Sequence, residues 1–154
     1  MRRLLLGLAL VLSAAGAAAA PDEDVEVPAI PGTTPAVSAE SRFNHGQALA
    51  RQNDWAGAEG AYRDAARLRP GFPEAWNGLG YALRRQGRLD ESVQAYREAL
   101  RLRPNYPQAL EYLGQAYVQL GRIAEARDVL ARLRPLDREE AEELARAIAK
   151  AARR

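Results

Sequence analysis

The sequence predicts an all-α fold, an α-solenoid of three helical hairpins followed by one capping helix. Three observations lead to this prediction: residues recur at a constant spacing of 34, apolar side chains follow helical spacing, and glycine and proline mark the helix ends. Pro70 and Pro104 are 34 positions apart, and so are Tyr62 and Tyr96. A constant period of this length is typical of stacked helical units, each of which covers its neighbour.

Each repeat contains two helical segments with a tight turn between them. In the second repeat the apolar residues have helical spacing in two runs, namely Trp76, Leu79 and Leu83, followed by Leu89, Val93 and Tyr96. Gly87 and Gly121 lie between such runs, where a helix must end and the chain must turn. We therefore expect a helix, a turn and a second helix in every unit.

The tetrad Arg-Leu-Arg-Pro occurs three times, at residues 67–70, 101–104 and 132–135. Its arginines favour the negative end of a helix dipole, and its proline ends the helix because it has no N–H. We expect its leucine to be the last buried residue of the second helix. Pro73 and Pro107 are expected in the first turn of the next helix, where proline is tolerated. The tetrad is therefore interpreted as a structural boundary.

These residues resemble the pattern of the tetratricopeptide repeat family, Trp-x2-Leu-Gly-x2-Tyr followed by alanine, an aromatic residue, alanine and proline. We assign the repeats to residues 39–72, 73–106 and 107–136. The matching positions are Gly46, Leu49, Ala58, Tyr62, Ala65 and Pro70 in the first repeat, Trp76, Leu79, Gly80, Leu83, Ser92, Tyr96, Ala99 and Pro104 in the second, and Leu110, Leu113, Gly114, Tyr117, Ala126 and Leu130 in the third.

Two departures from the family pattern lead to further expectations. Arg42 and His45 stand where apolar residues are expected, which suits a first repeat with one solvent-facing side. Pro104 and Pro135 are only 31 positions apart, so the second helix of the third repeat should be shortened. Recurring positions identify Trp55, Trp76, Tyr62 and Tyr96 as packing residues.

Residues 137–154 predict a C-terminal capping helix. Asp137 is a suitable N-cap, with a glutamate three positions later as in a capping box. Ala141, Leu144, Ala145 and Ile148 form one apolar stripe, which is expected to cover the third repeat. The rival interpretation, a helix on a membrane surface, is weaker because the stripe is mostly alanine and has no aromatic residue.

The N-terminal segment predicts export. Residues 1–20 have two arginines, an apolar run and then small residues, the three-part form of a cleavable signal peptide, and we expect cleavage after Ala19. An uncleaved membrane anchor or secretion is the alternative to a periplasmic location. Residues 21–38 are rich in proline and acids and predict a disordered linker. Its other interpretation is an acidic docking tail.

Composition argues against several classes of function. The whole chain has 22 basic and 20 acidic residues, but Arg2 and Arg3 leave with the signal peptide, so the mature chain is neutral. No long basic stripe is available for nucleic acid. The sequence has no cysteine, and its one histidine, His45, lacks the partners that a metal site needs. We expect no catalytic constellation, no cofactor and no metal, and an enzyme or metal protein built on His45 is the least favoured hypothesis.

With catalytic and metal sites set aside, the remaining kind of functional site is a binding surface. In the family that the sequence resembles, the first helices of successive repeats line a concave groove that holds an extended peptide or a partner helix. The resemblance implies that this groove presents Phe43, Gln47, Arg51, Asn77, Tyr81, Arg84, Arg85, Glu111, Gln115, Val118 and Gln119. Tyr81 beside two arginines suits a carboxylate or an acidic segment. Asn77 resembles one member of the family's carboxylate clamp, but the repeats contain no lysine, so that specificity is not transferred.

The sequence thus predicts an exported, non-catalytic scaffold that binds a protein or peptide segment. The alternative is a structural module that self-associates or joins a larger envelope complex. A third interpretation leaves the groove as an ordinary solvated surface.

Overall fold

The computed structural model describes residues 37–153. The expected signal peptide, and all of the expected linker except Val37 and Ser38, lie outside the described residues. All regular structure from residue 37 to 153 is helical, which confirms the predicted fold class. The seven helices are α1 (Ala39–Arg51), α2 (Trp55–Leu68), α3 (Pro73–Arg85), α4 (Leu89–Leu102), α5 (Pro107–Gln119), α6 (Ile123–Leu133) and α7 (Arg138–Ala151).

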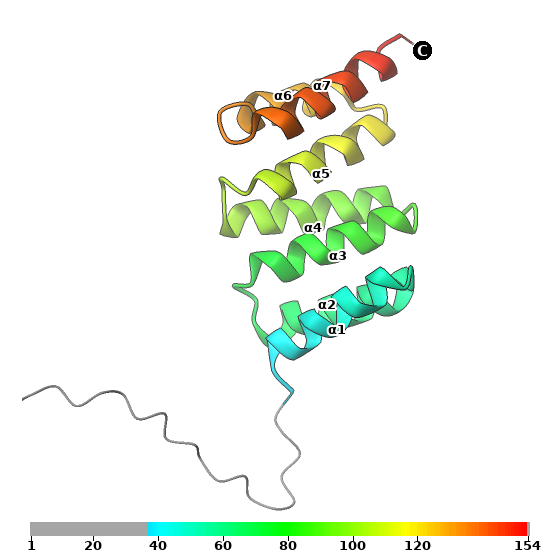
Figure 1. Cartoon of the computed structure of the whole chain (residues 1–154), viewed down its shortest axis with the longest axis vertical. Coiled ribbons are helices and arrows are strands. Elements are labelled where there is room, and N and C mark those ends of the chain that lie inside the picture. The colour runs from blue at the N-terminus through cyan, green and yellow to red at the C-terminus, as the bar shows by residue number, and fades with distance from the viewer. Residues whose placement is uncertain (1–36, 154) are drawn as a thin grey trace, which may run out of the picture. The chain divides into compact units, whose positions relative to one another are not determined.

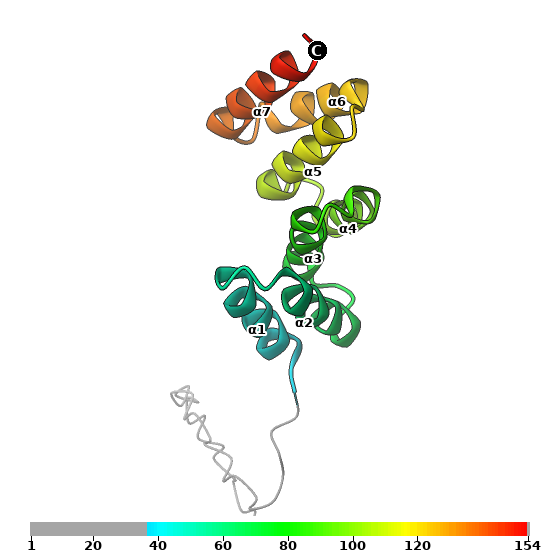
Figure 2. The same cartoon turned by 90° about the vertical axis from the view of Figure 1, so that its right-hand side faces the viewer.

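Consecutive helices pack as antiparallel pairs, α1 with α2, α3 with α4 and α5 with α6, and the pairs stack on one another (Figure 1). A second view separates an inner layer of α1, α3, α5 and α7 from an outer layer of α2, α4 and α6 (Figure 2). The backbones of the inner helices approach each other closely from one repeat to the next, whereas within the described residues the backbones of α2 and α4 lie farther apart, as do those of α4 and α6. The inner layer therefore forms the concave side of the stack.

Left-handed backbone closes the turn inside each hairpin. Gly87 and Gly121 have φ of 77° and 71°, as the sequence predicts for turn glycines. Asn53 takes the same conformation in the first repeat, with φ of 61°. It lies 34 positions before Gly87, so the turn recurs at the repeat spacing although glycine does not. Asparagine is one of the few other residues that adopt this conformation readily.

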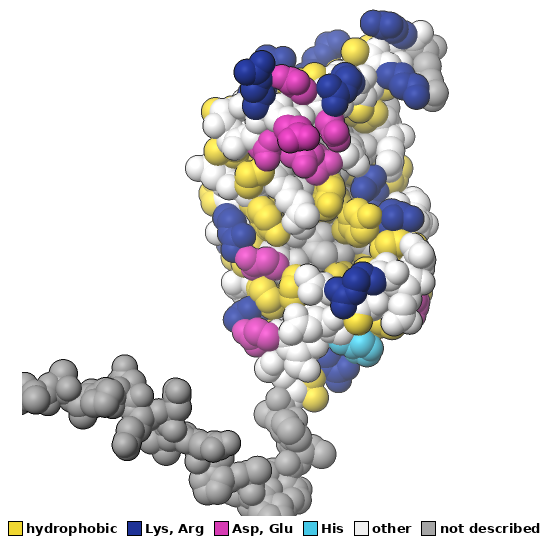
Figure 3. Space-filling model, in the orientation of Figure 1, with side chains coloured by type: hydrophobic (Ala, Val, Ile, Leu, Met, Phe, Trp, Pro, Cys, Tyr) yellow, Lys and Arg dark blue, Asp and Glu magenta, His cyan; other side chains and the backbone are white. Residues whose placement is uncertain are grey.

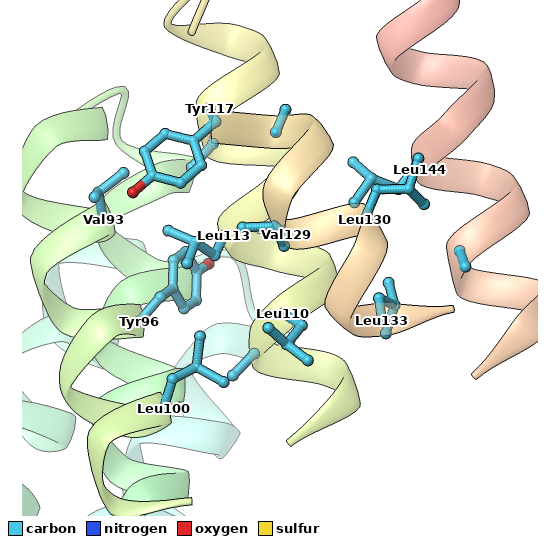
Figure 4. Packing of buried hydrophobic residues seen from close by; sticks show 14 of the residues in the cluster. Val93, Tyr96, Leu100, Leu110, Leu113, Tyr117, Val129, Leu130, Leu133 and Leu144 are labelled. Carbon is cyan, nitrogen blue, oxygen red and sulfur yellow. The ribbon is translucent and has the colours of Figure 1, made fainter. Parts of the chain in front are cut away.

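The core runs through the stack between the layers. Its C-terminal part is formed by α4, α5, α6 and α7, and Tyr96, Leu110, Leu133 and Leu144 are fully buried there (Figure 4). Gly80 allows α3 to approach α4 closely, because a Cβ at this position would lie 2.7 Å from the ring of Tyr96. The recurring glycine of the repeat therefore makes room for the aromatic residue of the second helix.

Proline and caps set the helix starts much as the sequence indicates. Pro73 and Pro107 are the first residues of α3 and α5. Ser38 caps α1, and Asp137 caps α7 by accepting a hydrogen bond from the backbone N–H of Glu140 at 3.1 Å. The apolar stripe of α7 is buried against α5 and α6, so this helix covers the end of the stack as predicted.

The Arg-Leu-Arg-Pro tetrads differ from one another in register, which corrects the expectation that each leucine is buried. Leu68 is 46% exposed, whereas Leu133 is fully buried. With the spacing of 34, Leu133 is equivalent to the buried Ala65 and Ala99, and Leu136 is equivalent to Leu68. The third tetrad therefore lies one helical turn earlier in its repeat, and α6 has 11 residues where α2 and α4 have 14.

The second arginine of the first two tetrads joins neighbouring elements. Arg69 pairs with Glu40 at the start of α1, and Arg103 pairs with Glu74 at the start of α3. Arg69 also lies 3.8 Å above the ring of Phe72, which leads into the next helix. These contacts are exposed, so each contributes little to stability, but they repeat with the period of the fold.

Candidate partner-binding groove

The helices of the inner layer project the expected groove residues from one face. On α3, Tyr81, Arg84 and Arg85 follow Asn77 by four, seven and eight positions, which brings the four side chains to the same side of the helix. The remaining residues of the set occupy equivalent positions on α1 and α5: Phe43, Gln47, Arg51, Glu111, Gln115, Val118 and Gln119. The repeat therefore aligns three such rows along the concave side.

The concave side contains a pocket of about 350 Å³, which opens between α1, α3 and α5. A second pocket, of about 390 Å³, lies on the outer layer. The concave pocket is lined by Phe43, Gln47, Tyr62, Glu74, Asn77, Gly78, Tyr81, Tyr106, Gln108 and Tyr112. Five of these ten residues are aromatic, and Glu74 is the one charged side chain among them. A hollow in which aromatic rings and a few polar groups converge is a common form of binding site.

Asn77 places an unsatisfied polar atom at this pocket. Its side chain is only 6% exposed, and its amide donates to the Oε1 atom of Gln108 at 3.1 Å. Its Oδ1 atom is buried without a hydrogen-bond partner. Because a buried carbonyl oxygen without a donor costs free energy, such an atom in a pocket indicates a place where a ligand or water donates a hydrogen bond.

Aromatic rings continue along the groove from the pocket. The ring of Tyr81 lies 5.7 Å from that of Trp55 and 5.2 Å from that of Tyr112, measured between centroids. Trp55 is only partly buried, so it lies at the edge of the groove and not in the core where the repeat pattern indicated. Rings at these distances form a broad, rigid contact surface.

The two neighbouring arginines are both held against this aromatic row. Arg85 lies 4.1 Å above the ring of Trp55 and donates to the hydroxyl of Tyr81 at 3.1 Å. Arg84 lies 5.4 Å from the Tyr81 centroid and 5.6 Å from that of Tyr112. Arg85 is exposed and remains open to an acidic group, whereas the Nε atom of Arg84 is buried without a partner.

Acidic side chains gather at the other end of the groove, over α5 and α7 (Figure 3). Glu111 of α5 is 7% exposed and accepts a hydrogen bond from Gln115. Burial, together with the nearby carboxylates of Glu140 and Glu143, raises the pKa of Glu111 to about 7, and Arg84 partly offsets this effect. Burial and the Glu111 charge also raise the pKa of Tyr112, although its bond with Gln108 lowers it.

The structure thus distinguishes among the expected groove residues. Gln47 lines the pocket, whereas Arg51 and Gln119 are exposed on the inner helices outside the lining. Val118 packs partly against the core, so its side chain is shared between the groove and the interior. Eight further residues contribute to the groove or to its acidic end, although the family pattern did not place them there: Trp55, Tyr62, Glu74, Tyr106, Gln108, Tyr112, Glu140 and Glu143.

One sequence signal could have identified Tyr112. It is 34 positions after Gly78, so a large ring in one repeat stands where its neighbour has no side chain. The absent side chain matters, because a Cβ at Gly78 would lie 2.7 Å from the Tyr62 ring. No comparable signal links Glu111 with Glu140, since α7 lies outside the repeat.

The second cavity, on the outer layer, is less suited to a ligand. It lies between α4 and α6 and is lined by three arginines together with Glu125 and Asp128. Each arginine has a partner there: Arg97 donates to Tyr117, Arg101 pairs with Glu98, and Arg132 donates to the carbonyl of Pro104. Its arginines and Glu125 are therefore already paired within the fold, and Asp128 is the lining carboxylate without an ion pair among the described residues.

The remaining candidates for a chemical site between residues 37 and 153 are His45 and any group of metal-binding side chains. His45 is exposed on α1, and no cluster of three or more histidine, aspartate or glutamate side chains in this region could hold a metal ion. Within the same residues, every helix is too short or too polar to cross a bilayer.

Stacked helical hairpins with a concave groove define the class of protein, an α-solenoid repeat protein. Two sequence models, both described as tetratricopeptide repeat, match residues 43–107 and 83–151 and together span more than half of the chain. The chain therefore belongs to the tetratricopeptide repeat family. Among curated proteins, none matches the chain.

Solved structures show the same fold at low sequence identity. The TPR2B domain of yeast Sti1, in a complex with pHsp70, has a TM-score of 0.70 and 22% identity over 75% of this chain and 96% of that one. The first TPR of Spaghetti (RPAP3), bound to the HSP90 peptide SRMEEVD, has a TM-score of 0.71 and 21% identity over 76% and 94%. The Arabidopsis OM64 TPR domain has a TM-score of 0.70 and 18% identity over 73% of this chain and 95% of that one.

Proposed function

We propose that this protein is a non-catalytic scaffold that binds an extended segment of a protein or peptide in its concave groove. The observation that carries the proposal is the aromatic pocket between α1, α3 and α5, where the Oδ1 atom of Asn77 lacks a donor. An extended segment supplies backbone N–H groups for such an atom and side chains for the pocket. The peptide complexes of Sti1 and RPAP3, which share the fold, support this mode of binding.

The basic end of the groove, which is formed by Arg51 and Arg85, contributes to the choice of partner. Arg85 and Arg51 are exposed on the inner helices, and Arg85 is oriented by its contacts with Trp55 and Tyr81. A guanidinium held in this way forms paired hydrogen bonds with a carboxylate at a low entropic cost. We therefore place an acidic residue of the bound segment at this end.

A capture experiment tests the proposal. The mature chain is crosslinked to partners in the native envelope fraction, in parallel with an Asn77→Ala/Tyr81→Ala variant that changes the groove. An Arg67→Ala/Arg101→Ala variant is the matched control, because both arginines lie on exposed faces of outer helices. We expect a partner that the parent and the control capture and the groove variant does not. A partner captured equally by all three would contradict groove binding, and capture of the chain by itself alone would favour self-assembly.

We also propose that the protein works in the cell envelope. The support is the signal-peptide pattern of residues 1–20, with paired arginines, an apolar run and small residues before Pro21. Expression in the native host followed by fractionation and N-terminal sequencing tests this. The expected result is a periplasmic chain that begins at Ala20. An intact N-terminus in the cytoplasmic fraction would overturn it.

A further inference from the structure

The acidic end of the groove contains two carboxylates that no arginine of the described residues pairs with, those of Glu111 and Glu140. Most carboxylates between residues 37 and 153 pair with an arginine, as Glu59, Glu91 and Glu98 do. Glu111 and Glu140, which face each other from α5 and α7, form no ion pair within the described residues. A patch of acidic side chains lies on this face of the molecule, over α5 and α7 (Figure 3).

The burial of Glu111 makes this arrangement costly without a ligand. The side chain is 7% exposed, accepts a hydrogen bond from the neutral amide of Gln115, and lies within hydrogen-bonding reach of Glu140. It faces Glu140 and Glu143 from α7 and Arg84 from α3, and because Glu143 pairs with Arg146, Glu140 is the neighbouring carboxylate without an arginine partner in the described part of the chain. A partly buried carboxylate in such surroundings is typical of functional sites, because a bound cation relieves the repulsion.

The adjoining pocket gives independent support. Its lining contains no lysine and no arginine, and its one carboxylate, Glu74, pairs with Arg103 outside the lining. The ring of Tyr112 borders both places, since Tyr112 lines the pocket and its phenol is influenced by the charge of Glu111. Asn77 adds a buried acceptor without a donor. Aromatic faces, a free acceptor and nearby carboxylates together favour a cationic donor.

We infer that the α3–α5–α7 part of the groove is a subsite for a lysine or arginine side chain of the bound segment. The stem of this side chain lies along Tyr112, its cationic head contacts Glu111 and Glu140, and the flanking backbone donates to Asn77. This inference rests on the proposed function and adds a specificity to it. Together with Arg85 at the basic end, this subsite makes the groove selective for a segment whose acidic and basic residues occur in a fixed order.

Selection from a random peptide library tests the subsite. Phage-displayed random dodecapeptides are selected on the full chain at pH 8, and the tightest peptide is synthesised with blocked termini. We expect enrichment of lysine or arginine, and an affinity about tenfold weaker for the Glu111→Gln/Glu140→Gln variant. A Glu142→Gln/Asp128→Asn variant, which loses the same charge elsewhere on the surface, should bind like the parent.

A double-mutant cycle then tests direct contact. Replacing the basic residue of the peptide by glutamine should weaken binding to the parent about tenfold and have little effect on binding to the Glu111→Gln/Glu140→Gln variant, because the interaction has already been removed. Selected peptides without an enriched lysine or arginine, or peptides whose basic residue contributes equally to binding on both proteins, would overturn the subsite while leaving groove binding intact.

Failure of the proposed function gives a different result. If the selected peptides bind the Asn77→Ala/Tyr81→Ala variant as tightly as the parent, or if no peptide is enriched at all, the groove is not the binding site and the subsite falls with it. If the parent self-associates and the Glu111→Gln/Glu140→Gln variant does not, a second copy of the chain covers the acidic end, which also overturns the peptide subsite.

Discussion

Glu111 is the side chain whose surroundings depart most from those of an ordinary surface glutamate. Burial and the carboxylates of α7 raise its pKa to about 7, so the carboxyl group is protonated at mildly acidic pH and ionised above neutrality. A folded-state pKa above the unfolded value means that this group favours folding below the unfolded pKa and that the benefit is lost as the pH rises through 7.

Glu111→Gln should therefore leave stability nearly unchanged at pH 4.5 and raise it by about 2 kcal/mol at pH 8.5, since glutamine does not ionise. Urea unfolding of the parent and the variant at the two pH values measures the difference. Asp128→Asn, at an exposed site on α6, is the control and should show no such pH-dependent gain. An equal effect of Glu111→Gln on stability at both pH values would contradict the raised pKa of Glu111.

Gly80 tests the close packing inside a hairpin. A Cβ there would lie 2.7 Å from the Tyr96 ring, which is fully buried and has little freedom to move. Gly80→Ala should destabilise the fold by about 1–3 kcal/mol, although alanine is the better helix former. Thermal unfolding by circular dichroism checks this, with Gly60→Ala as the control because its Cβ would meet open space. A more stable Gly80→Ala variant would show that α3 and α4 are not so close.

The C-terminal helix α7 closes the stack through a narrow apolar stripe. Leu144 is fully buried and reaches α5, where a Cβ at Gly114 would lie 2.4 Å from its side chain. Leu144→Ala should cost about 2–5 kcal/mol, as for other buried leucines. Chemical denaturation measures the loss, and Ala149→Ser on the exposed side of α7 should change stability little. A loss below about 1 kcal/mol would mean that α7 does not cap the array.

The helices themselves follow from local sequence. Prolines at helix starts, turn residues and a constant period each act within a few residues or within one repeat, so the pattern shows them directly. The exposure of Leu68 and the burial of Leu133 depend instead on the register of α6, which ends a turn early. The spacing of 31 residues indicates the early end of α6, but which leucine is buried follows only when equivalent positions are aligned at the spacing of 34.

The position of the groove could be predicted from the sequence, but the distribution of its unpaired charges could not. Family resemblance placed Asn77, Tyr81 and Glu111 on the concave side, because one helix face repeats through the stack. The aromatic row and the contact of Glu111 with Glu140 arise between helices that are distant in sequence, and α7 has no equivalent in the repeat. Which charges remain unpaired is therefore a property of the packed array and not of any single motif.

The groove residues should matter more for binding than for folding. Tyr81 is partly exposed, and its contacts are with other groove side chains, so Tyr81→Ala should change stability by about 1 kcal/mol or less. The same change should weaken a groove ligand by about tenfold or more, because central aromatic residues dominate binding energy. Parallel unfolding and titration experiments separate the two effects. Loss of the fold would place Tyr81 in the core instead.

The central claim, that the concave side binds a protein segment, is tested most directly by NMR. Backbone amide shifts of the full chain are followed while the selected peptide is added. We predict that the perturbed amides lie in α1, α3, α5 and α7, and that they are centred on Asn77, Tyr81 and Glu111. Perturbations centred on α2, α4 and α6 would contradict the account and assign binding to the outer layer.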